Sequence, residues 1–216
     1  VTGEVFDFGP WRFIQYANQN FTAAYFDHNG RYSFGRQPEA ALWALTQLGK
    51  SFNKLINEKR IIEILNEFST NFHLSLKRHF CWRIGIQDID AKSLSEIMNI
   101  LLNESEKHKI EFASFFYDFF GGKEAVIDCL KTNYGNKYKV EGFLKITDIL
   151  KDSQSSNGAL EKRKLINNNR ENMLIDEVEQ IWEEINKNDN WKLLERKISK
   201  VRKLGNSLES QKLVNF

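Results

Sequence analysis

Apolar residues recur at helical spacing over most of the chain beyond Pro38. Pro38 suits the first turn of a helix, and the apolar positions that follow it up to Gly49 are Ala41, Leu42, Leu45 and Leu48. A single longer helix is predicted from Glu58 to Trp82, with Gly85 just beyond its end. Its apolar stripe consists of Ile61, Ile62, Leu65, Phe68, Phe72, Leu76 and Phe80.

Three more helices are predicted in the middle of the chain. Asp90 or Ser93 is a suitable N-cap for the first, whose apolar positions are Leu94, Ile97, Met98, Leu101 and Leu102. The second is rich in phenylalanine and stops at Gly121-Gly122; it carries Phe112, Phe115, Phe116 and Phe119 as core residues. A short third helix is predicted over Glu124–Lys131.

The last third of the chain is more strongly charged. Residues 152–158 are small and polar and are the best candidate for a linker. Two amphipathic helices are predicted after it. Their apolar stripes are expected to be buried as packing faces, and the alternative is a surface for a partner. The first stripe comprises Leu174, Ile175, Val178, Ile181, Trp182 and Ile185, and the second comprises Trp191, Leu194, Ile198 and Val201.

The first 38 residues have a different pattern. They contain both prolines of the chain and a dense set of aromatic residues between Phe6 and Phe34, without a sustained helical period. Turn signals occur at residues 7–10 and 28–30. Because disordered segments are poor in aromatic residues, an ordered loop is predicted here. The sequence therefore predicts a mostly α protein with an irregular, aromatic-rich N-terminal segment.

Composition narrows the functional classes. The chain has 216 residues, 41% of them hydrophobic, which suits one domain or one and a half. No apolar run approaches the ~18 residues that a membrane span needs, and a net charge of +2 gives no broad field for nucleic acid. Cys81 and Cys129 lie far apart in helix-like surroundings, and no signal peptide follows Val1. A reducing, cytoplasmic location is expected, with no nucleic acid or membrane as partner.

The sharpest local motif is Val5-Phe6-Asp7-Phe8-Gly9-Pro10. In kinase-like folds, an apolar stretch that ends in Asp-Phe-Gly directs a carboxylate at the metal bound to nucleotide phosphates. Carboxylate oxygens are suitable ligands for Mg²⁺, and glycine permits the sharp turn. An aspartate in this context is more often a turn former that bonds to its own backbone, and on the three-residue motif alone this is the preferred interpretation.

The surroundings of this motif resemble the selenoprotein O (SelO) family of kinase-fold protein adenylyltransferases. The resemblance begins with Asp7-Phe8-Gly9-Pro10 and continues with residues 27–32 (Asp-His-Asn-Gly-Arg-Tyr), residues 34–38 (Phe-Gly-Arg-Gln-Pro) and residues 42–45 (Leu-Trp-Ala-Leu). Arg83-Ile84-Gly85-Ile86 and residues 111–116 are similar to later stretches of the family.

The resemblance implies the helical C-lobe of a protein-kinase-like fold, in three parts. Residues 1–36 hold the Asp-Phe-Gly motif and the equivalent of the activation segment, residues 37–150 the helical C-lobe, and residues 151–216 a linker and C-terminal amphipathic helices. Asp7 is implied as a Mg²⁺ ligand. In the family, ATP is bound in a reversed orientation so that AMP is transferred to a hydroxyl group of a protein substrate.

Other elements that the family needs do not match any residues of the chain. These are the glycine-rich and basic nucleotide-binding elements, a Lys–Glu pair, and an adjacent Asp-Asn that acts as base and second metal ligand. No catalytic residue and no cofactor-binding residue other than the metal ligand is therefore assigned. The chain is expected to be inactive by itself and not to bind Mg²⁺ and ATP alone, as a remnant or as one half of a split enzyme whose N-terminal lobe is a separate chain. The alternatives are a non-catalytic helical binding or scaffold module and, third, an unrelated all-α protein.

The remaining chemistry-bearing residues have simpler interpretations. The four histidines, His28, His73, His79 and His108, show no metal-ligand spacing with the cysteines, and Cys81 between two aromatic residues is expected to be a buried apolar residue. Arg31 and Arg36 are candidates for binding a phosphate or for pairing with a carboxylate of the loop, and pairing is the preferred interpretation. Lys162-Arg163-Lys164 is expected to form a solvated helix face.

Overall fold

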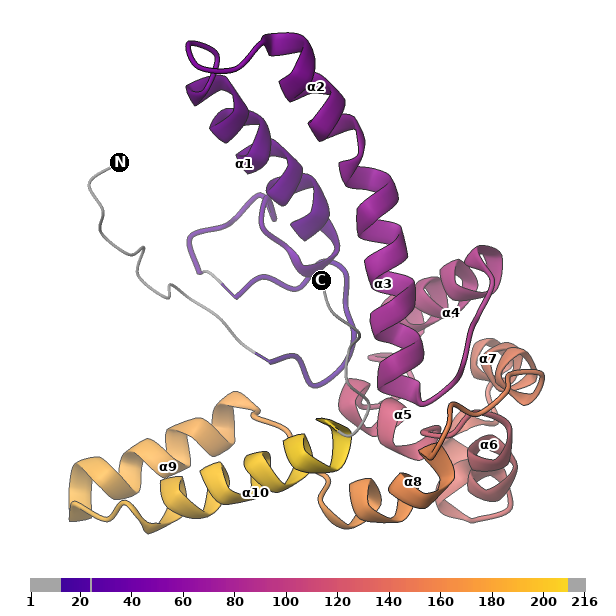
Figure 1. The fold of residues 1–216 in the computed structure, drawn as a ribbon. Helices are drawn as coiled ribbons and strands as arrows, with labels where there is room; N and C mark the ends of the chain where they lie inside the picture. The colour runs from indigo at the N-terminus through magenta and orange to yellow at the C-terminus, as the bar shows by residue number, and fades with distance from the viewer. Residues whose placement is uncertain (1–12, 24, 210–216) are drawn as a thin grey trace. The chain divides into compact units, whose positions relative to one another are not determined.

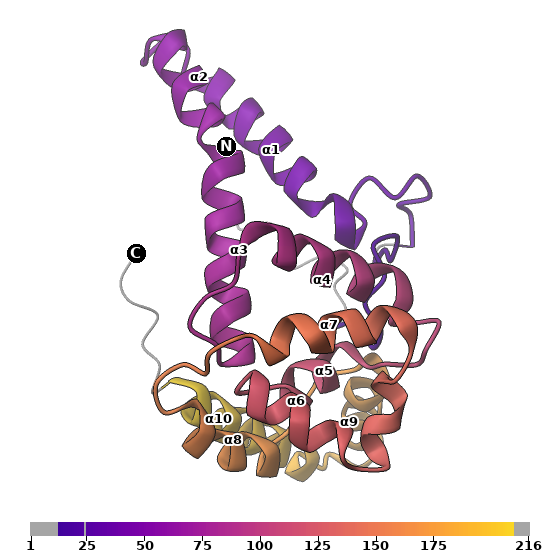
Figure 2. The same cartoon turned by 90° about the vertical axis from the view of Figure 1, so that its right-hand side faces the viewer.

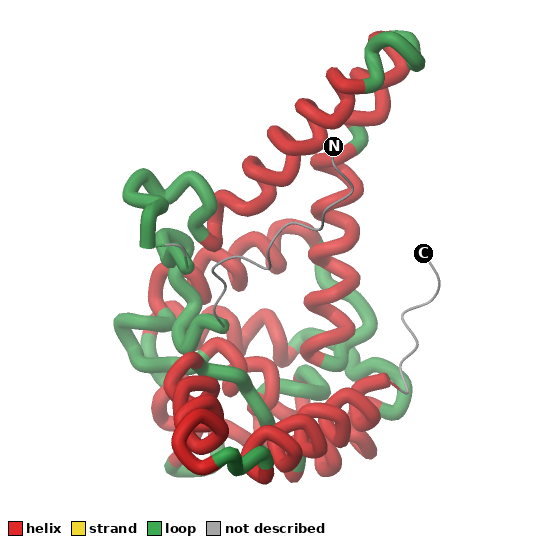
Figure 3. Tube along the Cα trace, turned by 90° about the vertical axis from the view of Figure 1, so that its left-hand side faces the viewer, coloured by secondary structure: helices red, strands yellow, loops and turns green. Residues whose placement is uncertain are grey.

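The computed structural model describes residues 13–23 and 25–209, which form helices joined by loops (Figures 1 and 3). Among these residues the only β-type pairing is an isolated antiparallel bridge between Ile86 and Ser155. The mostly helical fold predicted from the sequence is therefore confirmed. No helix within the described ranges is long and apolar enough to cross a membrane.

The described residues divide into two compact units. Unit 1 comprises residues 18–23 and 25–78, and unit 2 comprises residues 13–17 and 79–209. Helix α3 (Phe68–Ile84) begins in unit 1 and ends in unit 2. The functional division at residues 36 and 150 stays a prediction.

Unit 1 contains the 3₁₀ turn η1 (Phe34–Arg36), α1 (Gln37–Ser51), α2 (Glu58–Asn66) and most of α3. Pro38 lies in the first turn of α1, as its fixed φ favours. Helices α1 and α2 pack against each other, with Gly49 so close to Ile61 that a Cβ at position 49 would lie 2.7 Å from the Ile61 Cγ2. Within the described part of unit 1, only Ser33 and Ile61 are buried.

The single helix predicted from Glu58 to Trp82 is wrong, because two helices occupy this region. Helix α2 ends at Asn66 and α3 starts at Phe68, with Glu67 between them. The Glu67 N–H donates to the carbonyl of Ile64, three residues back, at 3.2 Å. This tighter turn interrupts the α-helical ladder without any proline or glycine, so the sequence carries no breaker to signal it.

Unit 2 holds nearly all of the buried side chains. Its elements beyond α3 are α4 (Ala91–Glu104), α5 (Phe112–Asp118), α6 (Lys123–Leu130), η2 (Tyr134–Tyr138), α7 (Glu141–Lys151), α8 (Ala159–Asn168), α9 (Ile175–Asn188) and α10 (Lys192–Glu209). Helix α7 packs against α4 and α6 (Figure 2). The predicted N-cap of α4 is confirmed for Asp90, whose carboxylate accepts the Ser93 N–H at 2.9 Å. The phenylalanine helix is confirmed as core, since Phe115 and Phe119 are fully buried.

Residues 152–158, the predicted linker, connect α7 to α8 within unit 2 and are tied to two other loops. The Gly85 carbonyl accepts the Ser156 N–H at 2.9 Å, and the Gly121 carbonyl accepts the Ser155 hydroxyl at 2.6 Å. Gly122 has φ of 65°, and a Cβ there would lie 2.8 Å from the Ile86 Cγ2. Glycine is therefore required where the three loops meet.

Helix α7 was not among the elements expected from the sequence. Its signal is present, because Phe143, Ile146 and Leu150 recur at helical spacing and all three are fully buried. The preceding residues 131–140 carry one glycine, two asparagines and three lysines, a polar composition typical of loops, and they contain the short η2 turn at Tyr134–Tyr138.

The expectation that both C-terminal stripes are buried is wrong for part of each stripe, whereas Leu174, Val178 and Leu194 are half-buried. Helices α9 and α10 pack against each other, yet Trp182 is 61% exposed and Trp191 50% exposed. Ile198 and Val201 are each 40% exposed. Only the C-terminal part of α10 packs against a hydrophobic core. There Leu204 and Leu208 contact the cluster that contains Tyr117 and Phe120, and α10 also packs on α8. Two paired helices bury only the sides that face each other and this core, so the outer part of each stripe stays in solvent.

Two glycine substitutions test the close packing of η2 against the end of α6. In Gly135→Ala the new Cβ would lie 2.0 Å from the Cys129 carbonyl oxygen, so we expect destabilisation by about 2 kcal/mol or more. Gly205→Ala is the matched control, because nothing lies within 4 Å of that Cβ and α10 gains up to about 1 kcal/mol of helix propensity. Urea unfolding followed by circular dichroism measures both. A stable Gly135→Ala variant would contradict the described path of η2.

Candidate functional site

The predicted metal ligand Asp7 lies outside the described residues, so the site is built from the segment that follows it. Residues 13–17 belong to unit 2. The Gln15 carbonyl accepts the Phe112 N–H at 2.8 Å, and the Gln15 side-chain amide donates to Glu111 at 3.3 Å. The Lys109 ammonium lies over the Tyr16 ring, 5.2 Å from its centroid. The start of α5 therefore anchors the chain a few residues beyond the Asp-Phe-Gly motif.

The next part of the segment folds as a compact loop in unit 1. The Asp27 carboxylate accepts the backbone N–H groups of Arg31 and Tyr32, both at 2.8 Å, across a turn in which Gly30 has φ of 61°. Such side-chain to backbone bonds are the reason that aspartate and glycine are favoured in turns. The Asp27 carboxylate is thus used to shape the backbone, and the Arg31 and Tyr32 side chains are left exposed.

The two ends of this loop are joined by backbone contacts. The Phe34 N–H donates to the Phe21 carbonyl at 2.9 Å, and the Gly35 N–H donates to the Gln19 carbonyl at 2.8 Å. A Cβ at position 35 would lie 2.8 Å from the Gln19 Cβ, so only glycine permits this approach. The loop leads directly into η1 and α1.

A surface pocket of about 360 Å³ lies where the loop meets α1. It is lined by Arg31, Tyr32, Arg36, Glu39, Ala40 and Trp43. Arg36 forms an ion pair, as expected, but with Glu39 of α1 and not with a carboxylate of the loop; Nε and Oε2 are 3.1 Å apart. The expected pairing is wrong for Arg31, whose guanidinium has no hydrogen-bond or ion-pair partner within the described residues, because the Asp27 carboxylate of the loop is taken by backbone N–H groups. The structure therefore brings the two predicted arginines to one pocket, with one of them available.

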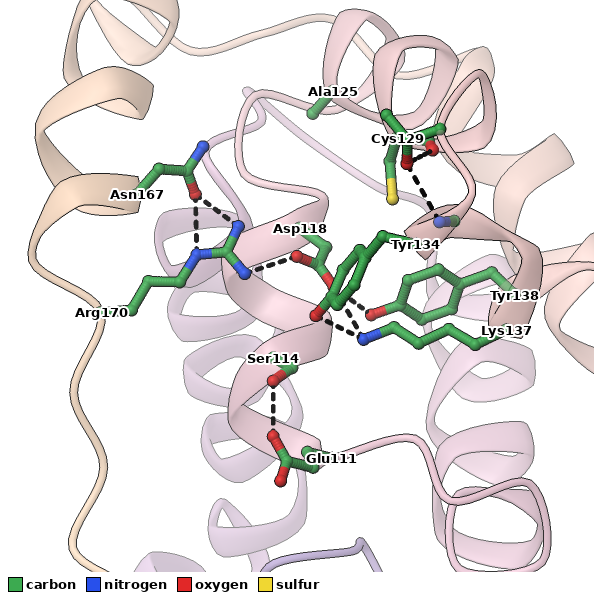
Figure 4. Close-up of polar contacts among 12 residues, drawn as sticks. Glu111, Ser114, Asp118, Ala125, Cys129, Tyr134, Lys137, Tyr138, Asn167 and Arg170 are labelled. Carbon is green, nitrogen blue, oxygen red and sulfur yellow. Dashed lines mark hydrogen bonds and ion pairs between the residues drawn. The ribbon is translucent and has the colours of Figure 1, made fainter.

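A buried carboxylate in unit 2, that of Asp118, was not anticipated from the sequence (Figure 4). Its side chain is only 2% exposed. Arg170 donates to Oδ1 at 2.6 Å, Tyr138 donates its hydroxyl to Oδ2 at 2.5 Å, and the Lys137 ammonium lies 3.2 Å from Oδ2. A charged residue inside the phenylalanine-rich run 112–120 is the sequence signal that could have drawn attention to it.

The Asp118 cluster has a structural role. Both carboxylate oxygens contact donors of the protein itself: Oδ1 accepts from Arg170, and Oδ2 accepts from Tyr138 and pairs with Lys137. Burial first, and then the charge of Asp118, raise the pKa of the Tyr138 hydroxyl, which keeps it protonated as the donor. Arg170 in turn is held by Asn167 at 2.7 and 3.1 Å (Figure 4). The cluster joins α5, η2 and the segment after α8.

Arg83, in the motif at residues 83–86, is also in a packing position. Its guanidinium lies 4.7 Å from the Tyr117 ring centroid and 5.4 Å from that of Phe116. Burial is the main reason that the pKa of Arg83 is lowered from its usual value. This cation therefore stabilises the aromatic core of unit 2 through cation–π contacts.

The cysteines, the possible metal ligands and Arg163 were the other candidates from the sequence. Cys81 is buried, as expected, and so is Cys129; neither forms a disulfide within the described residues. Within the described ranges no group of three or more histidine, cysteine, aspartate or glutamate side chains is arranged to hold a metal ion. The expected solvated face at residues 162–164 is wrong for Arg163, which is 19% exposed and pairs with Asp128 at 2.9 Å because α8 passes close to α6.

Comparison with known proteins identifies the family. The family model described as "Protein adenylyltransferase SelO" matches residues 1–202. The chain belongs to this family. The SelO resemblance inferred from the motifs is thereby confirmed, and the match includes the segment that contains Asp7.

Individual relatives cover less of the chain. The protein nucleotidyltransferase YdiU of Trichormus variabilis is 30% identical over 118 residues, which are 55% of this chain and 24% of the relative. That of Synechocystis sp. is 44% identical over 68 residues, 32% of this chain and 14% of the relative. That of Trichodesmium erythraeum is 23% identical over 197 residues, 88% of this chain and 42% of the relative. The chain spans less than half the length of these SelO-family relatives.

Removing the buried carboxylate tests the structural role of the Asp118 cluster. In Asp118→Ala the Arg170 and Lys137 charges and the Tyr138 hydroxyl lose their partner, and we expect a loss of about 3 kcal/mol of unfolding free energy or more. Asp148→Ala, at a position 72% exposed, is the control and changes stability by less than about 0.5 kcal/mol. Equal unfolding midpoints in urea for the two variants would refute this assignment.

The environment of Cys129 predicts low thiol reactivity. Burial, followed by the charge of Asp118, raises the pKa of the Cys129 thiol to about 11. A raised pKa means that the folded state holds this proton more tightly, so its stabilising contribution is complete below the unfolded value near 9 and is lost as the pH rises toward 11. In a Cys81→Ala background, iodoacetamide at pH 8 should modify Cys129 far more slowly in the folded protein than in urea. Equal rates, measured by mass spectrometry, would contradict the burial.

Proposed function

We propose that this chain supplies the helical, metal-binding part of a SelO-type protein adenylyltransferase with a protein-kinase-like fold. The observation that carries the proposal is the family match over residues 1–202, which includes the Asp-Phe-Gly motif. In the proposed reaction, a hydroxyl oxygen of a protein substrate forms a bond to the α-phosphorus of ATP. The bond to the bridging oxygen breaks, pyrophosphate leaves, and the hydroxyl proton passes to a base.

Asp7 is the residue proposed to bind Mg²⁺ in this reaction. Mg²⁺ prefers carboxylate and phosphate oxygens, and when bound it neutralises charge on the nucleotide phosphates. Positioning and charge neutralisation supply most of the catalysis in nucleotide transfer, so one carboxylate is insufficient. We therefore propose that AMP transfer also needs a glycine-rich and basic nucleotide-binding part, a Lys–Glu pair and an Asp-Asn pair. No residues of this chain match these elements.

Exposed apolar side chains on unit 1 favour its covering by a nucleotide-binding part. Large apolar side chains are exposed on α1 and just after it: Leu45 is 40%, Leu48 54% and Phe52 39% exposed. They recur at a spacing of three and four, so they lie along one side of the helix. Ile62 and Ile64 of α2 are 49% and 52% exposed. A helical unit with so little burial of its own is expected to be covered in the active protein, and we propose the nucleotide-binding part as the cover.

The second candidate function is a non-catalytic helical binding module. The exposed Trp182 and Trp191 on α9 and beside α10 favour it, because exposed tryptophan side chains are typical of protein-binding surfaces. Such a module needs neither ATP nor Asp7. Measurement of AMP transfer therefore separates the two functions, because only the first predicts it.

A chimera tests the proposal. In the Trichodesmium erythraeum relative, the matching 42% of the protein is replaced by this chain, and transfer of radiolabelled AMP from ATP to protein is measured with Mg²⁺. We expect transfer by the chimera, none by this chain alone, and a loss of at least about 100-fold in the Asp7→Asn chimera, because a metal ligand is lost.

The control is an Asp148→Asn chimera, in which an exposed carboxylate far from the motif in sequence is removed and activity is expected to be unchanged. A folded chimera with no AMP transfer would refute the catalytic proposal and leave the binding module. Transfer that survives Asp7→Asn would refute the role of Asp7.

A further inference from the structure

The pocket between the loop at residues 27–36 and the first turns of α1 has the chemistry of a recognition site. Its lining contains two guanidinium groups and one carboxylate, so its formal charge is +1. Arg36 is already paired with Glu39, whereas the Arg31 guanidinium has no partner among the described residues. The excess positive charge of the pocket is therefore that of Arg31.

The backbone that carries Arg31 is fixed before any ligand binds. Both Asp27 carboxylate oxygens accept backbone N–H groups, one from Arg31 and one from Tyr32, each at 2.8 Å. The next residue, Ser33, is buried, and its N–H donates to the Gly30 carbonyl at 3.1 Å. A ligand of Arg31 thus meets an ordered turn and has to restrict only one side chain, which lowers the entropic cost of binding.

Two aromatic rings stand beside this charge. Tyr32 is 53% exposed and Trp43 is 60% exposed, and both line the pocket. Tyrosine, tryptophan and arginine are the residues that most often dominate protein-binding energy, because each combines a large apolar area with a polar group. A ligand with an apolar group next to an anionic group matches this surface.

We propose that this pocket binds an acidic segment of a partner protein, with a carboxylate on Arg31 and an adjacent apolar side chain against Tyr32 and Trp43. A carboxylate carries one negative charge and so matches the single excess positive charge of the pocket. A phosphate group carries up to two negative charges and a nucleotide carries more, so neither would be neutralised by this pocket. Only the identity of the partner rests on the proposed function: the acidic segment belongs to the protein that receives AMP.

Binding of short peptides to the whole chain tests this without ATP or AMP transfer. The probe is a terminally blocked peptide of sequence Gly-Ser-Glu-Leu-Gly-Ser that carries an uncharged fluorophore, and its affinity is measured by fluorescence anisotropy. We expect the peptide with Gln in place of Glu to bind about fivefold more weakly, because an exposed charge-assisted contact is worth about 1 kcal/mol. Added salt is expected to weaken binding of the Glu peptide and not that of the Gln peptide.

Variants locate the contact. Arg31→Gln should reduce the affinity for the Glu peptide about fivefold and leave the Gln peptide unaffected. Arg31→Lys should retain part of the preference, since it keeps the charge without the planar fork. Arg60→Gln is the matched control, because Arg60 is an exposed arginine on α2 outside the pocket, and it should change nothing.

Three outcomes with the Glu and Gln peptides would overturn the proposal. They are absence of binding at millimolar chain, equal binding of the Glu and Gln peptides, and equal loss in Arg31→Gln and Arg60→Gln. A phosphoserine peptide that binds tenfold or more tightly than the Glu peptide would also overturn it, in favour of a phosphate site. Because no AMP transfer is measured, these results do not depend on whether the chimera is active.

Discussion

The Asp118 carboxylate is the interaction on which unit 2 depends most. A charge that is 2% exposed is tolerated only when it is fully paired, and here three donors from two different parts of the chain converge on its two oxygens. They fix α5 relative to η2 and to the segment that follows α8. Phe115, Phe119 and Tyr138 are packed around this point, and the aromatic core of unit 2 continues from there to Phe143 of α7.

The same helix also orders the segment that follows the Asp-Phe-Gly motif. The start of α5 holds residues 13–17 through the Phe112 N–H and the Glu111 carboxylate, and the far end of α5 carries Asp118. Within unit 2, the segment 13–17 is therefore held by hydrogen bonds to the start of α5. Unit 1 contrasts with unit 2, because its described part buries only Ser33 and Ile61 and displays apolar and aromatic side chains. The proposed function accounts for this contrast by assigning stability to the well-packed unit and recognition to the poorly covered one.

The sequence was sufficient for the elements whose signals are local. The N-cap at Asp90, the proline at the start of α1 and the phenylalanine core of α5 depend on residues close together in the chain. The family was also accessible, because the motifs at residues 7–10 and 27–38 resemble those of the family, whose model matches residues 1–202. What could not be predicted depends on contacts between distant residues. The pairing of Asp118 with Arg170 spans 52 positions, and exposure of Trp182 depends on how much of α9 its neighbours cover.

The break at Glu67 shows a different limit. Neither glycine nor proline occurs there, and apolar residues continue at helical spacing across it, so periodicity predicts one helix where a tightened turn makes two. The pocket at Arg31 shows a third limit. Both arginines were visible in the sequence, but the sequence does not show which of them is paired. In the structure the Asp27 carboxylate accepts backbone N–H groups and is not paired with a guanidinium, while Arg36 pairs with Glu39.

The central claim is that this chain is a helical part of an adenylyltransferase and needs a nucleotide-binding part from elsewhere. Isothermal titration calorimetry with Mg²⁺ and ATP tests it most directly, on the chain alone and on its chimera with the SelO-family relative. Our account predicts no measurable heat of binding for the chain alone and saturable binding for the chimera. Saturable binding of Mg²⁺-ATP by the chain alone would contradict the account.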